Sequence, residues 1–581
     1  MTGLQAWDYA IVALYLAISV GLGVCFVGRG TRSAETFFAS GGAMPWWIAG
    51  SSLLVACFAA DTPLWIGDVI YTRGIEGVWL YWAPGIGAAF FVLLIAPLWK
   101  RSGVMTDVEF LEVRYSGPAA SLMRLLNSAF YSLFASIMWM TLQTLSVATI
   151  IGSVTNIEKW KCVVGTTVLA GSYSIASGLW GVAGSGTFQF VITYIGSVVL
   201  AVYVVVTKTG GIGGLVESLH QLSVSWPQGA SLELLPSASQ FGLPAMTLVA
   251  LFGFRWIEQA GMGQYVAQRI IATRGPRQAV YAAMIWAIGF FAIVPLPWIV
   301  TVLAAKVVLP EIVDGQEAYP RMAMLLPVGL RGLLIASMLA AFMSTYSSLL
   351  NWGASYAIND FYRRFINRTA SERHYVRAGQ LYMAPMAIIA AGLAMYAGSL
   401  LNVIFVVQAV MCGYWTVAAA RWIWWRVNAW SEVAGWAGSI AAAVTTAFHP
   451  ATRHWWESDK MEQYFGQRTI TIMLCSLVLW LVTTLITAPT NEQQLDRFYR
   501  RVRPIGFWGP VKLRHPQYAG IGIPGVVASW TSMLGAIYAT LFGTLKLALG
   551  DYLVGLALTV FGVASIVWAV RLATKLYAEE R

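Results

Sequence analysis

The chain has 581 residues, of which 58% are hydrophobic and 11% are charged. Soluble domains carry about 25% charged residues, so this composition excludes a soluble protein and indicates one that crosses a membrane many times. The formal net charge of +11 is spread over several loops without a continuous basic stripe, and we therefore expect no nucleic-acid partner.

Fifteen apolar stretches are long enough to cross a bilayer. In chain order they are 8–28, 45–70, 77–99, 122–154, 162–178, 184–207, 243–263, 279–305, 328–359, 377–397, 401–425, 433–449, 470–488, 524–546 and 551–571. Lys and Arg are concentrated in alternate loops between these stretches, and basic loops stay in the cytoplasm. This asymmetry predicts a multi-pass plasma membrane protein, surrounded by lipid, with its N-terminus outside and its C-terminus cytoplasmic.

The stretch at 45–70 is interrupted by polar residues near its middle. Its centre reads Ala59–Ala60–Asp61–Thr62–Pro63, and proline removes a backbone donor and frees the carbonyl four residues before it. A carboxylate at bilayer depth is costly unless it is paired or hydrated, so Asp61 marks a candidate functional site.

The stretch at 243–263 carries a similar interruption. Gly253 and Gly261 bracket Arg255 and Glu258, which are three residues apart and can neutralise each other on one helix turn. If a core of ten spans begins at Trp46, the two interrupted stretches are its first and sixth helices. Broken helices in corresponding positions of two halves point to a binding site near the middle of the membrane.

The stretch at 328–359 carries a polar face. Ala341, Ser344, Thr345 and Ser348 are spaced i, i+3, i+4 and i+7, so they share one side of a helix. Such hydroxyls often bond back to their own helix or line a close helix contact. They are also the neutral oxygen ligands that a hard cation such as sodium requires.

Enzyme motifs are absent from the sequence. HExxH, GxSxG and GxxxxGK[ST] do not occur, the five cysteines show no CxxC spacing, and the five histidines lie in loops or at span ends. We therefore expect neither an enzyme nor a zinc site.

Short motifs in order along the chain resemble those of a known family. They are Trp46–Leu53, Tyr71 with Gly74, Tyr173 with Gly178–Val182 and Gln189, Gln268–Ile270, and Ala341–Arg363, which contains A-x-x-S-T, S-L-L-N and D-F-Y-R. Together they resemble the sodium:solute symporter family over roughly residues 8–425. Ala60–Leu64 and Trp424–Glu432 are similar to a bacterial branch with undefined substrates, which implies a bacterial inner membrane.

This resemblance implies an all-α, LeuT-like fold: a ten-helix inverted repeat with broken first and sixth core helices, plus flanking helices. The implied divisions are an extra N-terminal helix and cytoplasmic loop at 1–44, a first five-helix repeat at 45–207, an extracellular loop at 208–242, a second five-helix repeat at 243–425, and peripheral C-terminal helices at 426–581.

The family's activity implies sodium-coupled symport of a small organic solute by alternating access, with Na⁺ as the coupling ion. The implied sodium ligands are the carbonyls of Val55, Phe58 and Ala341 and the hydroxyls of Ser344 and Thr345. An aspartate that some members use for a second sodium is replaced here by Gly186, which predicts one sodium per solute.

The predicted solute site consists of Asp61, Thr62, Arg255, Glu258 and Gln408. This lining suits a small zwitterion or amine, with Asp61 within reach of Arg255 or of a substrate amine. Alternatively, Arg255 clamps a carboxylate of the solute in bidentate fashion. An amino acid, an amine and a carboxylate are therefore all candidate solutes.

Two alternatives stay open from the sequence. A sugar is disfavoured because the second core helix, Leu80–Pro84, lacks the carboxylate that sugar-transporting members place there. A non-transporting membrane sensor on the same fold is the other alternative, although the chain has no fused kinase-type domain. The sequence leaves the solute's identity and the oligomeric state open.

Overall fold

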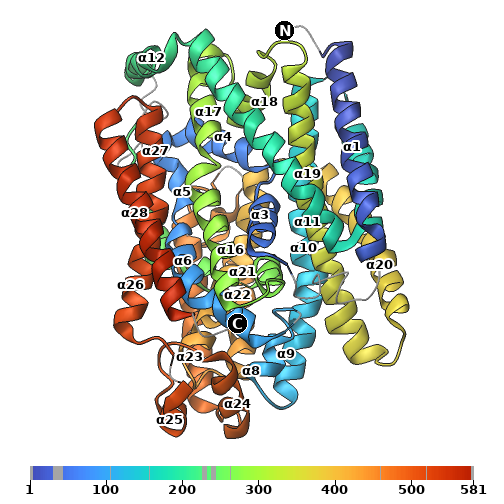
Figure 1. Ribbon diagram of the computed structural model, residues 1–581, viewed down its shortest axis with the longest axis vertical. Helices are drawn as coiled ribbons and strands as arrows, with labels where there is room; N and C mark the ends of the chain where they lie inside the picture. The colour runs from blue at the N-terminus through green and yellow to red at the C-terminus, as the bar shows by residue number, and fades with distance from the viewer. Residues whose placement is uncertain are drawn as a thin grey trace.

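The computed structural model describes residues 4–30, 44–104, 106–155, 157–225, 232–236, 244–261, 263–457, 460–518 and 520–577, and these ranges form a tall bundle of helices (Figure 1). No strand is assigned within them, and two isolated bridges join Met44 to Thr273 and Trp424 to Phe507. The all-α prediction is therefore confirmed.

The first half of the chain supplies the helices that carry the first interruption. They are α1 (Ala6–Gly30), α3 (Trp46–Cys57), α4 (Thr62–Arg73), α5 (Trp79–Trp82), α6 (Gly85–Phe90), α7 (Ala96–Ser102), α8 (Phe110–Arg114), α9 (Pro118–Ala129), α10 (Ser136–Val154), α11 (Lys159–Lys208) and α12 (Gly211–Ser225). Two π-helical segments, η3 (Phe91–Ile95) and η4 (Phe130–Ala135), join α6 to α7 and α9 to α10.

The second half supplies the remaining helices. They are α13 (Ala245–Val249), η5 (Ala250–Arg255), α14 (Ile257–Ala260), α15 (Gln264–Ile271), α16 (Pro276–Ile288), α17 (Leu296–Val308), α18 (Ala318–Ala323), α19 (Leu330–Ser355), η8 (Tyr356–Ile366), α20 (Glu372–Tyr396), α21 (Leu400–Ile423), α22 (Ala429–Phe448), α23 (Phe465–Ile486), α24 (Glu492–Val502), α25 (Gly509–Arg514), α26 (Ile523–Leu534), α27 (Thr540–Ala548) and α28 (Tyr552–Leu576).

The described residues contain ten helices long and apolar enough to cross a membrane, or eleven if a bent pair counts as one span. Fifteen spans were predicted. The stretches at 45–70 and 243–263 are broken, and those at 8–28 and 433–449 form α1 and α22. The predicted join at 178–184 lies inside α11, a single assigned helix of 50 residues, and the side chains of residues 176–189, Gly186 included, lie outside the described part.

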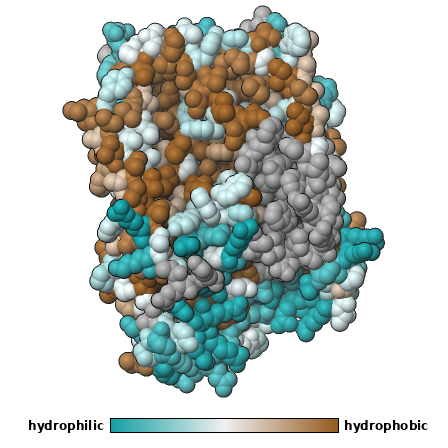
Figure 2. Space-filling view, in the orientation of Figure 1, coloured by the Kyte–Doolittle hydropathy of each residue, from teal (hydrophilic) through white to brown (hydrophobic). Residues whose placement is uncertain are grey.

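On the face shown in Figure 2, hydrophobic residues cover much of the upper part and hydrophilic residues gather at the lower end. Large apolar side chains of α28, such as Leu553 and Val560, are exposed, as expected for a surface that faces lipid. The hydrophilic end contains α8, α9, α24 and α25 (Figure 1).

The helix α19 lies in the interior and is buried over almost its whole length. It packs against α1, α3, α10, α11 and α20. Asp8 of α1 fixes its start, because this carboxylate accepts hydrogen bonds from Arg331 at 2.6 Å and from the backbone N–H of Gly329 at 2.8 Å. A side chain at Gly332 would meet the Asp8 backbone at 2.6 Å, so the close approach requires glycine there.

Both predicted interruptions are present. Between α3 and α4 the chain leaves the helix at Phe58 and re-enters it at Thr62, with a bend of 53°. Pro63 occupies the first turn of α4, where a missing N–H is tolerated. The second interruption divides residues 245–271 into α13, η5, α14 and α15, and Gly261 ends α14.

Candidate binding site at the broken helices

A cavity of about 190 Å³ lies between the two broken helices. An apolar cavity of about 150 Å³ is large enough for benzene, so this cavity suits a small organic molecule. The walls come from the α3–α4 break, η5 and α14, together with α10, α19 and α21. All five residues predicted to bind solute line it: Asp61, Thr62, Arg255, Glu258 and Gln408.

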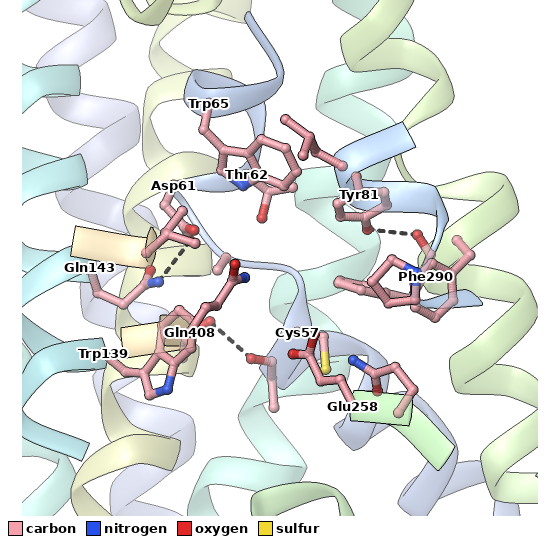
Figure 3. Close-up of a pocket in the computed structure, with 18 of the residues that line it drawn as sticks. Cys57, Asp61, Thr62, Trp65, Tyr81, Trp139, Gln143, Glu258, Phe290 and Gln408 are labelled. Carbon is pink, nitrogen blue, oxygen red and sulfur yellow. Dashed lines mark hydrogen bonds between the residues drawn. The ribbon is translucent and has the colours of Figure 1, made fainter. Parts of the chain in front are cut away.

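Asp61 is buried at the start of α4, with 6% of its surface exposed. Its carboxylate accepts a hydrogen bond from the Gln143 side chain of α10 at 2.7 Å (Figure 3). In the described part of the chain, no cationic side chain forms an ion pair with Asp61. The suggested contact with Arg255 is therefore not made in this structure.

Gln143 was not predicted as a site residue. It lies within a long apolar stretch whose nearest threonines, Thr141 and Thr144, bond back to their own helix. A glutamine inside such a stretch is an available sequence signal, because an amide cannot be left in lipid without partners.

Arg255 and Glu258 form an ion pair on one helix turn, with 2.6 Å between Nε and Oε2. The guanidinium also lies 5.7 Å from the centre of the Phe465 ring. Both side chains are largely buried, with 7% and 17% exposed. The structure thus shows the mutual neutralisation that their spacing allows, and a bidentate clamp on a solute carboxylate would have to break this pair.

Three glutamines present unsatisfied oxygens around the cavity. The Oε1 atoms of Gln143, Gln259 and Gln408 are buried and have no hydrogen-bond partner among the described residues, and all three residues line the cavity. A buried amide oxygen without a donor is costly. The wall is therefore rich in acceptors that a ligand with N–H or O–H groups can satisfy.

Aromatic rings form much of the remaining wall: Trp65, Tyr81, Trp139, Trp286, Phe290, Phe291 and Phe405. The polar atoms of two of these rings are already engaged. The Tyr81 hydroxyl donates to the Phe290 carbonyl at 2.7 Å (Figure 3), and the Trp286 indole N–H lies 3.2 Å from the Cys57 sulfur. The ring faces can attract a cation by their quadrupoles.

The polar face of α19 meets the end of α3. The Thr345 hydroxyl lies 3.4 Å from the Ala56 carbonyl oxygen. No hydrogen bond from Ser344 is found in the described part of the chain, although Ser344 is only 3% exposed. By contrast, the hydroxyls of Ser347 and Ser355 bond back to α19 carbonyls at 2.6 and 2.7 Å.

The carbonyl oxygens at the end of α3 differ in whether they accept a backbone hydrogen bond. The Val55 oxygen accepts a hydrogen bond from the Phe58 N–H at 3.1 Å. Across the described break, no backbone N–H bonds to the Ala56 or Phe58 oxygen. Ala56 was not among the predicted ligands, yet its carbonyl is the one that Thr345 approaches.

The fourth residue of the predicted polar face has a different role. The Ser348 hydroxyl accepts a hydrogen bond from Arg269 at 2.8 Å, and Gln268 donates to Asn351 at 3.3 Å. These bonds join α15, which follows the second break, to α19. Ser348 is therefore engaged by protein, whereas Ser344 is not.

A second, smaller cavity of about 40 Å³ adjoins the first, and the two share Trp139 and Glu258 in their walls. Its other lining residues include Asp107 and Asn127, which lie toward the hydrophilic end. Trp139 and Glu258 thus stand between the main cavity and that end of the molecule.

A network of charges closes this end. Arg124 bridges Asp360 at 2.7 Å and Glu112 at 2.5 Å, and Arg364 adds a contact to Glu112 at 3.0 Å. Burial opposes ionisation of Glu112, but the hydrogen bonds from Arg364 and Arg124 hold the pKa of its carboxyl below its usual value. The network joins α8 and α9 to η8, directly below α19.

A helical membrane protein with two broken helices around a central cavity is a secondary transporter of the inverted-repeat class. Residues 37–429 match the family described as "Sodium:solute symporter family". Because the match covers most of the chain, the protein belongs to that family. It is a sodium-coupled symporter with Na⁺ as its coupling ion, and not an enzyme.

Individual relatives are distant. The chain is 24% identical to the "Sodium/glucose cotransporter" of Vibrio parahaemolyticus over 519 residues, which are 84% of this chain and 92% of that protein. It is 26% identical to the "Sodium/iodide cotransporter" of Homo sapiens over 426 residues, covering 70% of this chain and 64% of the human protein.

One solved structure supports the fold. The substrate-bound, outward-open state of a Na⁺-coupled sialic acid symporter matches with a TM-score of 0.67 and 20% identity. The match covers 84% of this chain and 99% of that one. At this identity, the likeness shows the fold and does not transfer the solute.

Proposed function

We propose that the protein couples entry of one Na⁺ to uptake of a small organic solute that carries an ammonium group, an amine or an amino acid. The observation that carries this proposal is Asp61, a carboxylate on the cavity wall that is held only by the neutral Gln143 amide at 2.7 Å among the described residues. A buried charge is normally paired. A cationic group of the solute supplies the missing counter-charge.

The rest of the wall favours the same chemistry. The unsatisfied oxygens of Gln259 and Gln408 can accept from the N–H groups of an ammonium ion. Aromatic faces surround the cavity and favour a cation over an anion. Arg255 is already neutralised by Glu258, so a solute with a carboxylate alone would meet no free cation there.

A sugar is the second candidate solute. The Gln259 and Gln408 amides also suit hydroxyl groups, and the Vibrio relative is a sodium/glucose cotransporter by name. A neutral sugar, however, would leave Asp61 as an uncompensated charge, which is why an ammonium solute ranks first.

We infer that sodium binds between α19 and the end of α3. Ser344 and Thr345 offer hydroxyls that are not bonded back to their own helix, and the predicted ligands Val55, Phe58 and Ala341 flank the same contact. The Ala56 carbonyl, 3.4 Å from the Thr345 hydroxyl, extends the predicted set. Neutral oxygens of this kind replace the hydration shell of a hard cation.

We also propose that the hydrophilic end of the molecule is cytoplasmic. This end carries the basic helix α24 (Figure 1) and gathers hydrophilic residues (Figure 2), as the positive-inside rule requires of a cytoplasmic end. The N-terminus then lies outside, and the plasma membrane, a bacterial inner membrane, is the proposed location. The division into two five-helix repeats with peripheral C-terminal helices stays a prediction.

Ligand-induced thermal stabilisation of the purified protein tests the proposal. A panel of amines, amino acids, carboxylates and sugars is measured in sodium and in potassium buffer. We expect ammonium compounds to raise the melting temperature in sodium, and Asp61→Asn to abolish that shift. Asp551→Asn is the matched control, because this carboxylate does not line the cavity.

Stabilisation by sugars but not by amines would assign the sugar function instead. An Asp61→Asn protein that still responds to amines as the wild type does would show that the proposed counter-charge is wrong.

A further inference from the structure

Arg468, near the start of α23, is a buried arginine without an acidic partner among the described residues. Only 1% of the residue is exposed. Its Nη1 donates to the Trp455 carbonyl at 2.8 Å, whereas Nε and Nη2 have no hydrogen-bond partner among the described residues. The ionisable group that interacts with it electrostatically there is the thiol of Cys412, not a carboxylate.

This situation differs from that of other buried arginines in the same bundle. Four of them face carboxylates within 4 Å: Arg331 with Asp8, Arg124 with Asp360, Arg255 with Glu258, and Arg421 with Glu432. A cation without such a partner in a low-dielectric interior is strongly unfavourable. Arg468 therefore requires a counter-charge that the described side chains do not provide.

One edge of the Arg468 guanidinium is buried and has no hydrogen-bond partner among the described residues. Aromatic rings lie next to the group, with the Phe405 and Trp456 centres 5.6 and 5.0 Å from the central carbon. Nη1 is occupied by Trp455. Nε and Nη2 form the edge with which arginine grips an anion through two parallel hydrogen bonds.

We propose that this edge of Arg468 binds a small anion between α21 and α23. The packing of Phe405 and Trp456 around the guanidinium favours a compact anion such as chloride; a carboxylate group of the transported solute is the other source of the same chemistry. Arg468 does not line the main cavity, but Phe405, whose ring lies next to its guanidinium, does, so the anion site adjoins the cavity wall.

Anion binding is linked to the solute site through these aromatic rings. Phe405 packs against Phe465 with 5.4 Å between ring centres, and Arg255 of the cavity lies over the Phe465 ring. A bound anion therefore fixes the wall formed by Phe405 and favours a cationic solute beside it.

The test uses the purified protein and compares chloride with methanesulfonate, a bulkier anion without a carboxylate, at constant sodium. Chloride should raise the melting temperature of the wild type, and Arg468→Met should remove that shift. Arg453→Met is the matched control, because Arg453 belongs to the same α22–α23 connection but is exposed. Equilibrium dialysis of the wild type against radiolabelled chloride gives a second measurement, should Arg468→Met fail to fold.

Each outcome decides the proposal. Saturable chloride binding that Arg468→Met abolishes supports a free anion. A shift produced by acetate or by carboxylate-bearing solutes, but not by chloride, and lost in Arg468→Met, supports the solute's carboxylate as the source. Equal stability in chloride, acetate and methanesulfonate, with no saturable binding to the wild type, overturns the proposal. Asp61→Asn should keep the chloride response, so failure of the solute assignment is distinguishable from failure of the anion site.

Discussion

Removal of the Ser344 and Thr345 hydroxyls, neither of which bonds back to α19, should weaken sodium binding without unfolding the protein. Thr345→Val keeps the shape of the side chain and removes the oxygen that lies 3.4 Å from the Ala56 carbonyl. Ser344→Ala removes a buried hydroxyl that forms no hydrogen bond to the described residues. Neither change breaks a bond within α19, so its fold should persist.

The size of the expected loss in sodium affinity follows from the charge of the bound ion. A hydrogen-bonding group that contacts an ion contributes about 1.5–3 kcal/mol, and about 1.4 kcal/mol corresponds to a tenfold change in affinity. Each substitution should therefore raise the sodium concentration for half-maximal uptake by about 10- to 100-fold. Solute affinity at saturating sodium should change much less, because Asp61 is held by Gln143 and neither hydroxyl bonds to Asp61 in the described part of the chain.

The assay is sodium-dependent solute uptake in reconstituted vesicles, together with sodium-induced thermal stabilisation of the same variants. Ser355→Ala is the matched control, because its hydroxyl bonds back to the Trp352 carbonyl at 2.7 Å and is not available to an ion. If a Ser344→Ala/Thr345→Val double variant keeps the sodium dependence of the wild type, these two hydroxyls do not bind sodium.

Three further expectations concern the cavity and the coupling ratio. Gln143→Leu removes the hydrogen bond to Asp61 and should weaken solute binding about tenfold or more, while the sodium concentration for half-maximal uptake stays the same. Equal solute affinity in the variant and the wild type would count against a role of Gln143 in holding Asp61. Glu258→Gln leaves Arg255 unpaired, so this variant should lose more thermal stability than the Arg255→Gln/Glu258→Gln double variant. Its loss should stay below the about 3–5 kcal/mol expected for breaking a fully buried pair, because Glu258 is 17% exposed. A double variant that is less stable than Glu258→Gln would contradict a structural pair. Gly186 offers no carboxylate for a second ion, so the Hill coefficient for sodium should be one, and a sodium-to-solute flux ratio of two would be inconsistent with that stoichiometry.

Local chemistry made the two helix breaks predictable. Pro63 lacks a backbone donor, and Asp61 has no place in a continuous apolar helix, so the interruption of α3–α4 follows from the sequence alone. The i, i+3 spacing of Arg255 and Glu258 likewise predicts their pairing, because residues on the same helix turn need no tertiary information to meet.

Contacts between distant segments could not be predicted in the same way. Gln143 and Asp61 are 82 residues apart, and nothing in either local sequence specifies their meeting. The approach of Thr345 to Ala56 depends on where α3 ends, and tertiary packing against α19 fixes that register. The sequence also does not reveal that Arg468 has no acidic partner among the described residues, because acidic residues elsewhere in the chain could have reached it.

Accumulation of solute in reconstituted vesicles is the direct test of sodium-coupled uptake of an ammonium-bearing solute. Wild-type protein is given an inward sodium gradient and a labelled amine or amino acid taken from the stabilising compounds. We expect the labelled solute to accumulate inside the vesicles above its external concentration. This accumulation should be lost when sodium is equal on both sides or is replaced by potassium, and in the Asp61→Asn variant. Uptake that reaches only the external concentration, at the same rate in sodium and in potassium, would contradict sodium-coupled uptake.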